Sequence, residues 1–226
     1  MTKIFISYQT ADGSIASRLQ KSLSAFGLNS FLAHEDIVVS EVWRTRILEE
    51  LYTSDICVCL LSTHYLESVW CVQEAGISAF HKGMIPIPLR LDDSLPPGFL
   101  NVIQAVKCDP DSISIIDILP GMLHGGSSAG VDIAISLIEG SRSYRWSETY
   151  YQILLPYIQN LTDNQAIRLL NVTRNNGQVF DAGLCAREYV PQVLTLFGHL
   201  IPQELKIELL DNCNQYRSFA NLDEIS

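Results

Sequence analysis

The chain has 226 residues, of which 47% are hydrophobic and 18% charged, and its formal net charge is -10 at neutral pH. This composition is typical of a globular protein that buries a core, and it excludes a largely disordered chain. The acidic balance and the lack of any basic run argue against nucleic-acid binding through lysine and arginine, and against docking on an anionic membrane.

The first part of the chain alternates strand patterns with amphipathic helix patterns. Because strands that alternate with helices at this spacing form parallel sheets with right-handed crossovers, we expect an α/β fold with helices on both faces of the sheet. Ligands of such sheets bind beyond the carboxyl ends of the strands. The predicted strands are KIFISY at 3–8, LNSFLA at 28–33, DICVCLLS at 55–62, MIPIPLRL at 84–91 and AVKC at 105–108.

Beyond the predicted sheet the pattern changes. The stretch 112–130 mixes apolar and glycine-rich pieces, and its GGSSAG run predicts a flexible connection, because no lysine follows it as in a phosphate-binding loop. A helix pattern resumes at 131–140, so we expect the first domain to span residues 1–140. Residues 147–226 contain only helix-period segments separated by turn residues, which predicts a small all-α domain.

The two predicted domains differ in charge. Residues 1–140 carry eight lysines and arginines against sixteen acidic residues, whereas residues 141–226 carry seven against nine. A nearly neutral surface rich in apolar and amide side chains suits a protein partner. A bundle that packs on the sheet domain for stability explains residues 147–226 equally well.

The cysteines and histidines predict no metal site. Six cysteines occur without a CxxC pair, so we expect reduced and mostly buried thiols. Cys57 and Cys59 lie in an apolar strand, on opposite or shared faces of the sheet. The opening MTKIFISY lacks the features of a secretory signal, and no apolar run is long enough to span a bilayer, so we expect a cytoplasmic protein.

The stretch SVWCVQE at 68–74 places a carboxylate beside an indole. If it is helical, Trp70 and Glu74 lie one above the other on the same face. On an arbitrary helix, Glu74 would be a surface residue and Trp70 a core residue. Cys71 has no identifiable base nearby and is interpreted as a packed thiol.

Four motifs in chain order resemble the successive boxes of a Toll/interleukin-1 receptor (TIR) domain. The resemblance covers residues 3 to about 107 and implies a flavodoxin-like sheet of five parallel strands, in agreement with the periodicity. The most specific motif is LS-x2-Y-x2-S-x-WC-x2-E, formed by Leu61, Ser62, Tyr65, Ser68, Trp70, Cys71 and Glu74. The other motifs are FISYQTAD at 5–12, HEDIVVSEVW at 34–43 and MIPIPLRLD at 84–92.

The resemblance implies one of two activities. Many bacterial and plant members and a few animal members cleave NAD+ between nicotinamide and ribose, whereas animal receptors and adaptors mainly assemble signalling complexes. Because nicotinamide leaves as a neutral molecule, one carboxylate that stabilises the oxocarbenium-like transition state can suffice. Glu74 fits that catalytic role, and Trp70 fits the flat apolar surface against which nicotinamide or ribose would be oriented.

Residues at the end of the first strand are further candidates for substrate binding. Ser7, Tyr8 and Gln9 lie where enzymes of the family contact the nucleotide. Tyr8 could equally be a packing residue. Asp12 occupies the same region and could simply cap the first helix.

The stretch from Asp36 to Trp43 corresponds to the loop that in enzymes of the family covers the substrate and meets a neighbouring protomer. Asp36 and Trp43 are therefore predicted to bind substrate, although Trp43 also fits a half-buried position at the start of a helix. The sequence departs from the family pattern at Ser40, where glycine is common.

The first hypothesis is a cytoplasmic TIR-domain NAD+ glycohydrolase or ADP-ribosyl cyclase, with NAD+ as its substrate and no cofactor. The resemblance implies self-association through the TIR domain and a role in bacterial anti-phage defence. The second hypothesis is a non-enzymatic signalling adaptor or scaffold, and the third is a nucleotide-binding sensor without turnover. No residue decides between hydrolysis and cyclisation.

Overall fold

The computed structural model describes residues 2–33 and 43–223. The chain forms two compact units, Met1–Gly125 and Gly126–Ser226. The first unit contains the sheet and the second is entirely helical in its described part.

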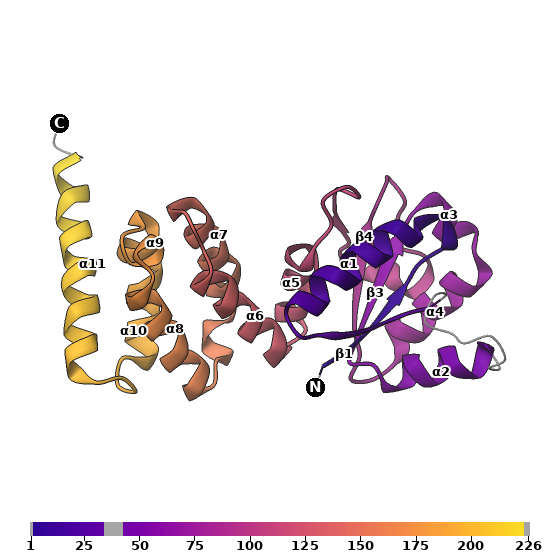
Figure 1. The fold of residues 1–226 in the computed structure, drawn as a ribbon, viewed down its shortest axis with the longest axis horizontal. Helices are drawn as coiled ribbons and strands as arrows, with labels where there is room; N and C mark the ends of the chain where they lie inside the picture. The colour runs from indigo at the N-terminus through magenta and orange to yellow at the C-terminus, as the bar shows by residue number, and fades with distance from the viewer. Residues whose placement is uncertain (1, 34–42, 224–226) are drawn as a thin grey trace. The chain divides into compact units, whose positions relative to one another are not determined.

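The first unit is built on a five-stranded parallel sheet with the strand order β2-β1-β3-β4-β5 (Figure 1). From β1 the chain moves outward to β2 and then returns past β1 to β3, so the direction of winding reverses between β1 and β3. This order confirms the predicted flavodoxin-like sheet. The strands are β1 (Lys3–Ser7), β2 (Asn29–Leu32), β3 (Ile56–Leu61), β4 (Ile85–Arg90) and β5 (Val106–Lys107).

Helices cover both faces of the sheet. On one face, α2 (Trp43–Thr53) and α4 (Val69–Phe80) contact each other and pack on β1. On the other face, α1 (Gly13–Ala25) contacts α5 (Ile115–His124), which packs on β4. The core between the sheet and the first pair of helices is formed by Phe5, Phe31, Cys57, Cys59, Ile47, Leu51, Cys71 and Ala75. The central strand β3 is buried along its whole length, as its continuous apolar sequence predicts.

The stretch 112–130 is more regular than expected, because it contains the helix α5. The N-cap of α5 is Ser114, whose backbone N–H donates a hydrogen bond to the Asp117 carboxylate in a capping box, and the helix continues through Pro120. The glycines allow a close approach to β4, because a Cβ atom at Gly125 would lie 2.6 Å from the Ile85 side chain. The run GGSSAG is not a flexible connection throughout, because its last three residues already belong to the next helix.

The second unit consists of helices in which α8 packs on α6 and α10, and α10 packs on α11 (Figure 1). The all-helical pattern predicted for 147–226 agrees with this unit, but the unit begins earlier, at Gly126. The expected boundary near Gly140 differs because α6 packs on α7 and α8. The elements are α6 (Ser128–Glu139), α7 (Tyr144–Leu154), η3 (Leu155–Asn160), α8 (Asp163–Asn175), α9 (Gly177–Phe180), a π-helical turn η4 (Cys185–Tyr189), α10 (Val190–Phe197) and α11 (Gln203–Asp223).

The cysteine prediction is confirmed, since all six cysteines are free and buried. Cys57 and Cys59 share one face of β3, with their Sγ atoms 3.8 Å apart. Across residues 2–33 and 43–223, no helix is both long and apolar enough to cross a membrane.

Candidate active site

Glu74 lies buried at the reversal point of the sheet. Its side chain is 2% exposed, and its Oε2 atom lies 2.5 Å from the Oγ atom of Ser7, the last residue of β1. Ser7 is in register with Cys59 of β3, so the carboxylate lies beside the end of β1, where the direction of winding reverses. The structure thus brings together two residues that are 67 positions apart in the sequence.

A chain of hydrogen bonds leads from Glu74 into the core. The Ser7 hydroxyl lies 2.9 Å from the Tyr65 hydroxyl, which in turn donates to the backbone carbonyl of Cys71 at 3.0 Å. Tyr65 is fully buried on α3 (Thr63–Glu67). Among the described residues, no hydrogen-bond partner of the second carboxylate oxygen, Oε1, is present.

Burial raises the pKa of Glu74 to about 7, and the hydrogen bond from Ser7 opposes the rise only in part. Within the described chain, no lysine, arginine or histidine forms an ion pair with Glu74. The carboxyl group is therefore poised to change its charge near neutral pH, a property that concentrates at reactive sites.

The serines of the LS-x2-Y-x2-S-x-WC-x2-E motif position this cluster by capping two consecutive helices. The Ser62 side chain accepts a hydrogen bond from the backbone N–H of Tyr65 and so starts α3. The Ser68 side chain does the same for Cys71 and starts α4. Because one residue separates the two helices, the motif fixes both Tyr65 and Glu74 against the end of β1.

The other residues after β1 take different positions. Tyr8 is 1% exposed, which agrees with a packing role. The Gln9 side chain accepts a hydrogen bond from the Ala11 backbone and caps the turn η1 (Thr10–Asp12). Asp12 does not cap α1 with its side chain, because its carboxylate accepts a 2.6 Å hydrogen bond from the Ser62 hydroxyl. This bond ties the loop after β1 to the loop after β3.

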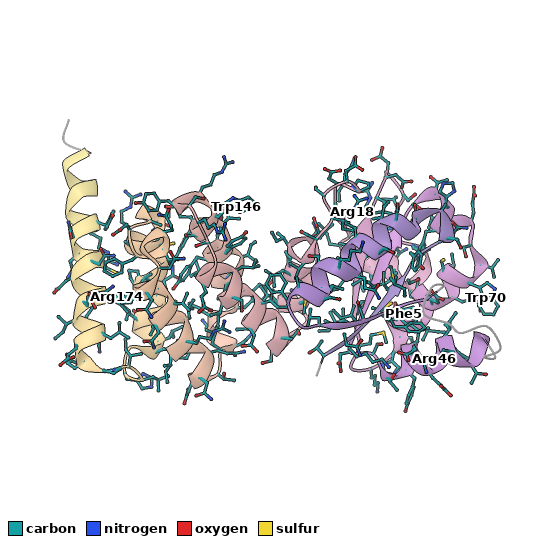
Figure 2. The ribbon with its side chains drawn as sticks, in the orientation of Figure 1. Phe5, Arg18, Arg46, Trp70, Trp146 and Arg174 are labelled. Atoms are coloured by element: carbon teal, nitrogen blue, oxygen red, sulfur yellow. The ribbon has the colours of Figure 1, made fainter. Side chains whose placement is uncertain are left out.

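Trp70 lies one helical turn before Glu74 on α4 and is only partly buried. Figure 2 shows it at the periphery of the sheet unit, whereas Phe5 lies within that unit. Trp70 is therefore not a core anchor in this conformation. Asp36 lies outside the described residues, and Trp43 is the first residue of α2, with a side chain that is likewise outside them.

A cavity of about 450 Å³ lies between α2 and α4. It is lined by Thr45, Leu48, Glu49, Tyr52, Ile77 and His81, and none of the predicted site residues contributes to it. The Tyr52 and His81 rings meet edge to face across it. This cavity is distinct from the cluster around Glu74. Within residues 2–33 and 43–223, no group of three or more histidine, cysteine or acidic side chains could hold a metal ion.

A comparison with known protein families identifies the family of this sheet unit. The family described as TIR domain matches residues 4–116, which is half of the chain. The chain belongs to the TIR domain family. The match includes the sheet, apart from Lys3 at the start of β1, and the whole Ser7–Tyr65–Glu74 cluster, whereas the helical unit lies outside it.

One similar solved structure is the TIR domain of the Toll-related receptor TRR-2 from the lower metazoan Hydra magnipapillata. The two chains are 21% identical, the match covers 48% of this chain and 86% of the receptor domain, and the TM-score is 0.42. A search of curated proteins finds no match.

Ser62 and Tyr65 belong to the motif, but the sequence alone indicated no role for them at the site. The spacing LS-x2-Y contained the signal, because a serine three residues before a buried tyrosine at a strand end is the pattern of an N-cap. What the sequence could not reveal is that the Tyr65 hydroxyl reaches Ser7, since that contact joins residues 58 positions apart.

Proposed function

We propose that the TIR unit cleaves NAD+ between nicotinamide and ribose, with Glu74 as the catalytic residue. The observation that carries the proposal is a buried carboxyl group, without a cationic partner among the described residues, at the point where the strand order reverses. Open α/β sheets bind their ligands in the crevice at this point. A carboxyl group that served stability alone would be expected to lie beside a cation.

In the proposed reaction, the electrons of the bond between ribose and nicotinamide move onto the pyridinium ring, which leaves as neutral nicotinamide. The positive charge passes to the ribose, where the Glu74 carboxylate stabilises it. Loss of one such preorganised group typically lowers kcat about 100- to 1,000-fold. Water then adds to the ribose carbon and releases a proton, which gives ADP-ribose. Attack by the adenine ring instead would give a cyclic isomer.

The neighbouring residues support the same roles. Ser7 holds Oε2 and so fixes the orientation of the Glu74 carboxyl group. Trp70 offers a partly exposed aromatic surface one turn away on the same helix. Because Glu74 is 2% exposed, NAD+ would reach it only after neighbouring side chains move, as in enzymes whose sites close over their substrates. Self-association of the TIR unit is one event that could drive such a movement.

The test is to incubate the purified full chain with NAD+ and to measure nicotinamide. We expect release by the wild-type protein and a loss of at least about 100-fold in Glu74→Gln. Glu67→Gln is the matched control, because Glu67 is an exposed glutamate on the preceding helix α3. Chromatography of the products would separate ADP-ribose from its cyclic isomers. Absence of nicotinamide release from micromolar to high protein concentration, also under crowding that promotes assembly, would contradict the proposal.

The second candidate is a signalling scaffold, which a different observation favours. Large apolar side chains are exposed on α2 and α4, with Tyr52 74% and Phe80 87% exposed. Exposed apolar residues of this size are typical of protein interfaces. The scaffold predicts that Phe80→Ser weakens self-association in sedimentation experiments, and that Glu74→Gln leaves association and signalling unchanged.

A further inference from the structure

Three close contacts link four oxygen atoms around Glu74. They join Glu74 Oε2 to Ser7 Oγ at 2.5 Å, Ser7 Oγ to Tyr65 Oη at 2.9 Å, and Tyr65 Oη to the Cys71 carbonyl at 3.0 Å. A hydrogen bond needs one proton between its two oxygens. The two hydroxyl groups supply two protons, and the carbonyl supplies none. If Glu74 is ionised, one of the three contacts therefore carries no proton.

A protonated Glu74 removes this shortfall. Its O–H group then donates to Ser7, the Ser7 hydroxyl donates to Tyr65, and the Tyr65 hydroxyl donates to the Cys71 carbonyl. Every contact receives one proton, and all donors point in the same direction along the chain. The ionised form would instead place a full charge in a site where the described residues supply one hydroxyl donor and no cation.

A shortage of protons among hydrogen-bonded oxygens does not by itself show that Glu74 is protonated, because the helical unit contains a similar shortage. There, Ser141 and Ser147 contact each other at 2.7 Å, and each also contacts a backbone carbonyl, so two protons again serve three contacts. No acidic group takes part in those contacts, and each of the two carbonyls also accepts a helical N–H bond. Around Glu74 the shortfall coincides with a buried acid that can supply the third proton.

We infer that Glu74 rests as the neutral acid in this conformation, and that Tyr65 is the positioning residue that holds it there through Ser7. This inference rests on the proposed function only for its catalytic meaning. If Glu74 acts on NAD+ as a carboxylate, its proton must first leave to solvent. The cationic nicotinamide ring, once beside Glu74, would favour that loss because it stabilises the charged form.

Among the described residues, the other titratable groups around Glu74 are one tyrosine and three cysteines. The hydrogen bond between Cys57 and Cys59, together with burial, raises the pKa of Cys57, and the same hydrogen bond lowers the pKa of Cys59. Burial raises the pKa of Cys71 to about 12, and it also raises the pKa of Tyr65. Glu74 is the carboxyl group of this cluster, so its carbonyl band in an infrared spectrum reports its own protonation whatever the charge of the thiols.

Replacing Tyr65 with phenylalanine should shift the titration of Glu74 to lower pH. In the wild-type protein, the acid form makes all three hydrogen bonds and the ionised form makes two. Without the Tyr65 hydroxyl, each form keeps a single hydrogen bond between Glu74 and Ser7. The variant therefore loses the extra bond that favours the acid, and the midpoint should fall by roughly half to one pH unit.

The experiment is infrared spectroscopy of the full chain without NAD+, between pH 5 and 9. The carboxylic-acid carbonyl band of Glu74 is assigned by its loss in Glu74→Gln. We expect this band to titrate with a midpoint near 7 in the wild-type protein and at lower pH in Tyr65→Phe. Tyr151→Phe is the matched control, because it removes another fully buried tyrosine hydroxyl, bonded to Thr173, and should leave the midpoint unchanged.

An ionised Glu74 at pH 6 in the wild-type protein would overturn the inference, even if Tyr65→Phe failed to fold. An unchanged midpoint in a folded Tyr65→Phe protein would overturn the role of Tyr65. The spectrum is independent of turnover, so a protonated Glu74 in a protein that never cleaves NAD+ would refute the proposed function and leave the inference standing. Cleavage of NAD+ by a protein whose Glu74 is ionised at pH 6 would do the reverse.

Discussion

Two buried glutamates in the described part of the TIR unit have opposite surroundings. Glu50 of α2 is 6% exposed and lies 2.6 Å from the Lys3 ammonium group and 2.8 Å from the Arg46 guanidinium group. Glu74 of α4 is 2% exposed, and within the described chain its carboxyl group has only the Ser7 hydroxyl as a hydrogen-bond partner. Burial alone therefore does not mark a functional carboxylate. The absence of a compensating charge among the described residues is what sets Glu74 apart.

The largest expected effect is the response of stability to pH at Glu74. Its pKa in the folded protein is about 7, above the ordinary 4.5, so the folded state binds this proton more tightly than the unfolded state. Stability should therefore fall as pH rises between these two values, by roughly 3 kcal/mol in all. Glu74→Gln cannot ionise and should be more stable than the wild-type protein by about that amount at pH 8, with little difference at pH 4.5.

The measurement is amide hydrogen exchange in β1 and β3, which reports unfolding of the TIR unit separately from that of the helical unit. Equal stability of Glu74→Gln and wild-type protein at both pH values would mean that Glu74 carries no unfavourable charge when buried. It would then resemble Glu50, and the contrast between the two glutamates would disappear.

Glu50→Gln should change stability in the opposite direction. The variant leaves Lys3 and Arg46 without their carboxylate, although both cations remain partly exposed and can recover some hydration. We expect a loss of about 1–3 kcal/mol in the free energy of unfolding at pH 8. Denaturant titration of the tryptophan fluorescence, compared with the exchange of β1 amides, would measure it. A gain in stability would show that the ion pairs cost more than they contribute.

The two buried tyrosines provide a smaller test. Tyr65→Phe should cost about 2 kcal/mol at pH 5, where two hydrogen bonds are lost, and about 1 kcal/mol at pH 8.5, where one is lost. Tyr151→Phe removes the hydroxyl bonded to Thr173 and should cost about 1 kcal/mol at both pH values. Amide hydrogen exchange, measured separately in the TIR unit and in the helical unit, would report the loss of stability in each variant. Parallel pH profiles for both variants would contradict the coupling of Tyr65 to Glu74.

The smallest effect is expected for a glutamate on the surface. Glu139 pairs with Arg168 in the helical unit at 2.8 Å, and both side chains are about half exposed. Glu139→Gln should change the free energy of unfolding by less than about 1 kcal/mol, and the change should shrink further in high salt. Urea titration in low and high salt would measure it. A larger loss would indicate that the Arg168 contacts are part of a stabilising network.

The order of helices and strands in the TIR unit could be predicted from the sequence, because the hydrophobic period and the length of each segment are local properties. The continuous apolar run at 56–61 predicted the central strand, and Gly27 marked the turn after the first helix, where it adopts a positive φ of 71°. Helix α5 was missed because Pro120 and the surrounding glycines resemble a loop, whereas the capping box at Ser114 and the contact with β4 make it a helix.

The site was predictable in part for the same reason. Trp70 and Glu74 share a face of one helix, and the motif spacing identified that face. The burial of Glu74 and its link to Ser7 depend on β1 and β3 being neighbours in the sheet, which no local pattern records. Gln9 took another role because its side chain satisfies a backbone N–H group in its own turn.

The position of α6 has a practical consequence for studying the TIR unit by itself. A shortened chain that ended at Gly140 would carry the whole of α6 without its packing partners α7 and α8. The buried side chains of that helix, among them Ile133, Ile135 and Ile138, would then be exposed to solvent and would promote aggregation. A chain that ends at Gly125 or Gly126 retains α5, which packs on β4, and leaves out α6.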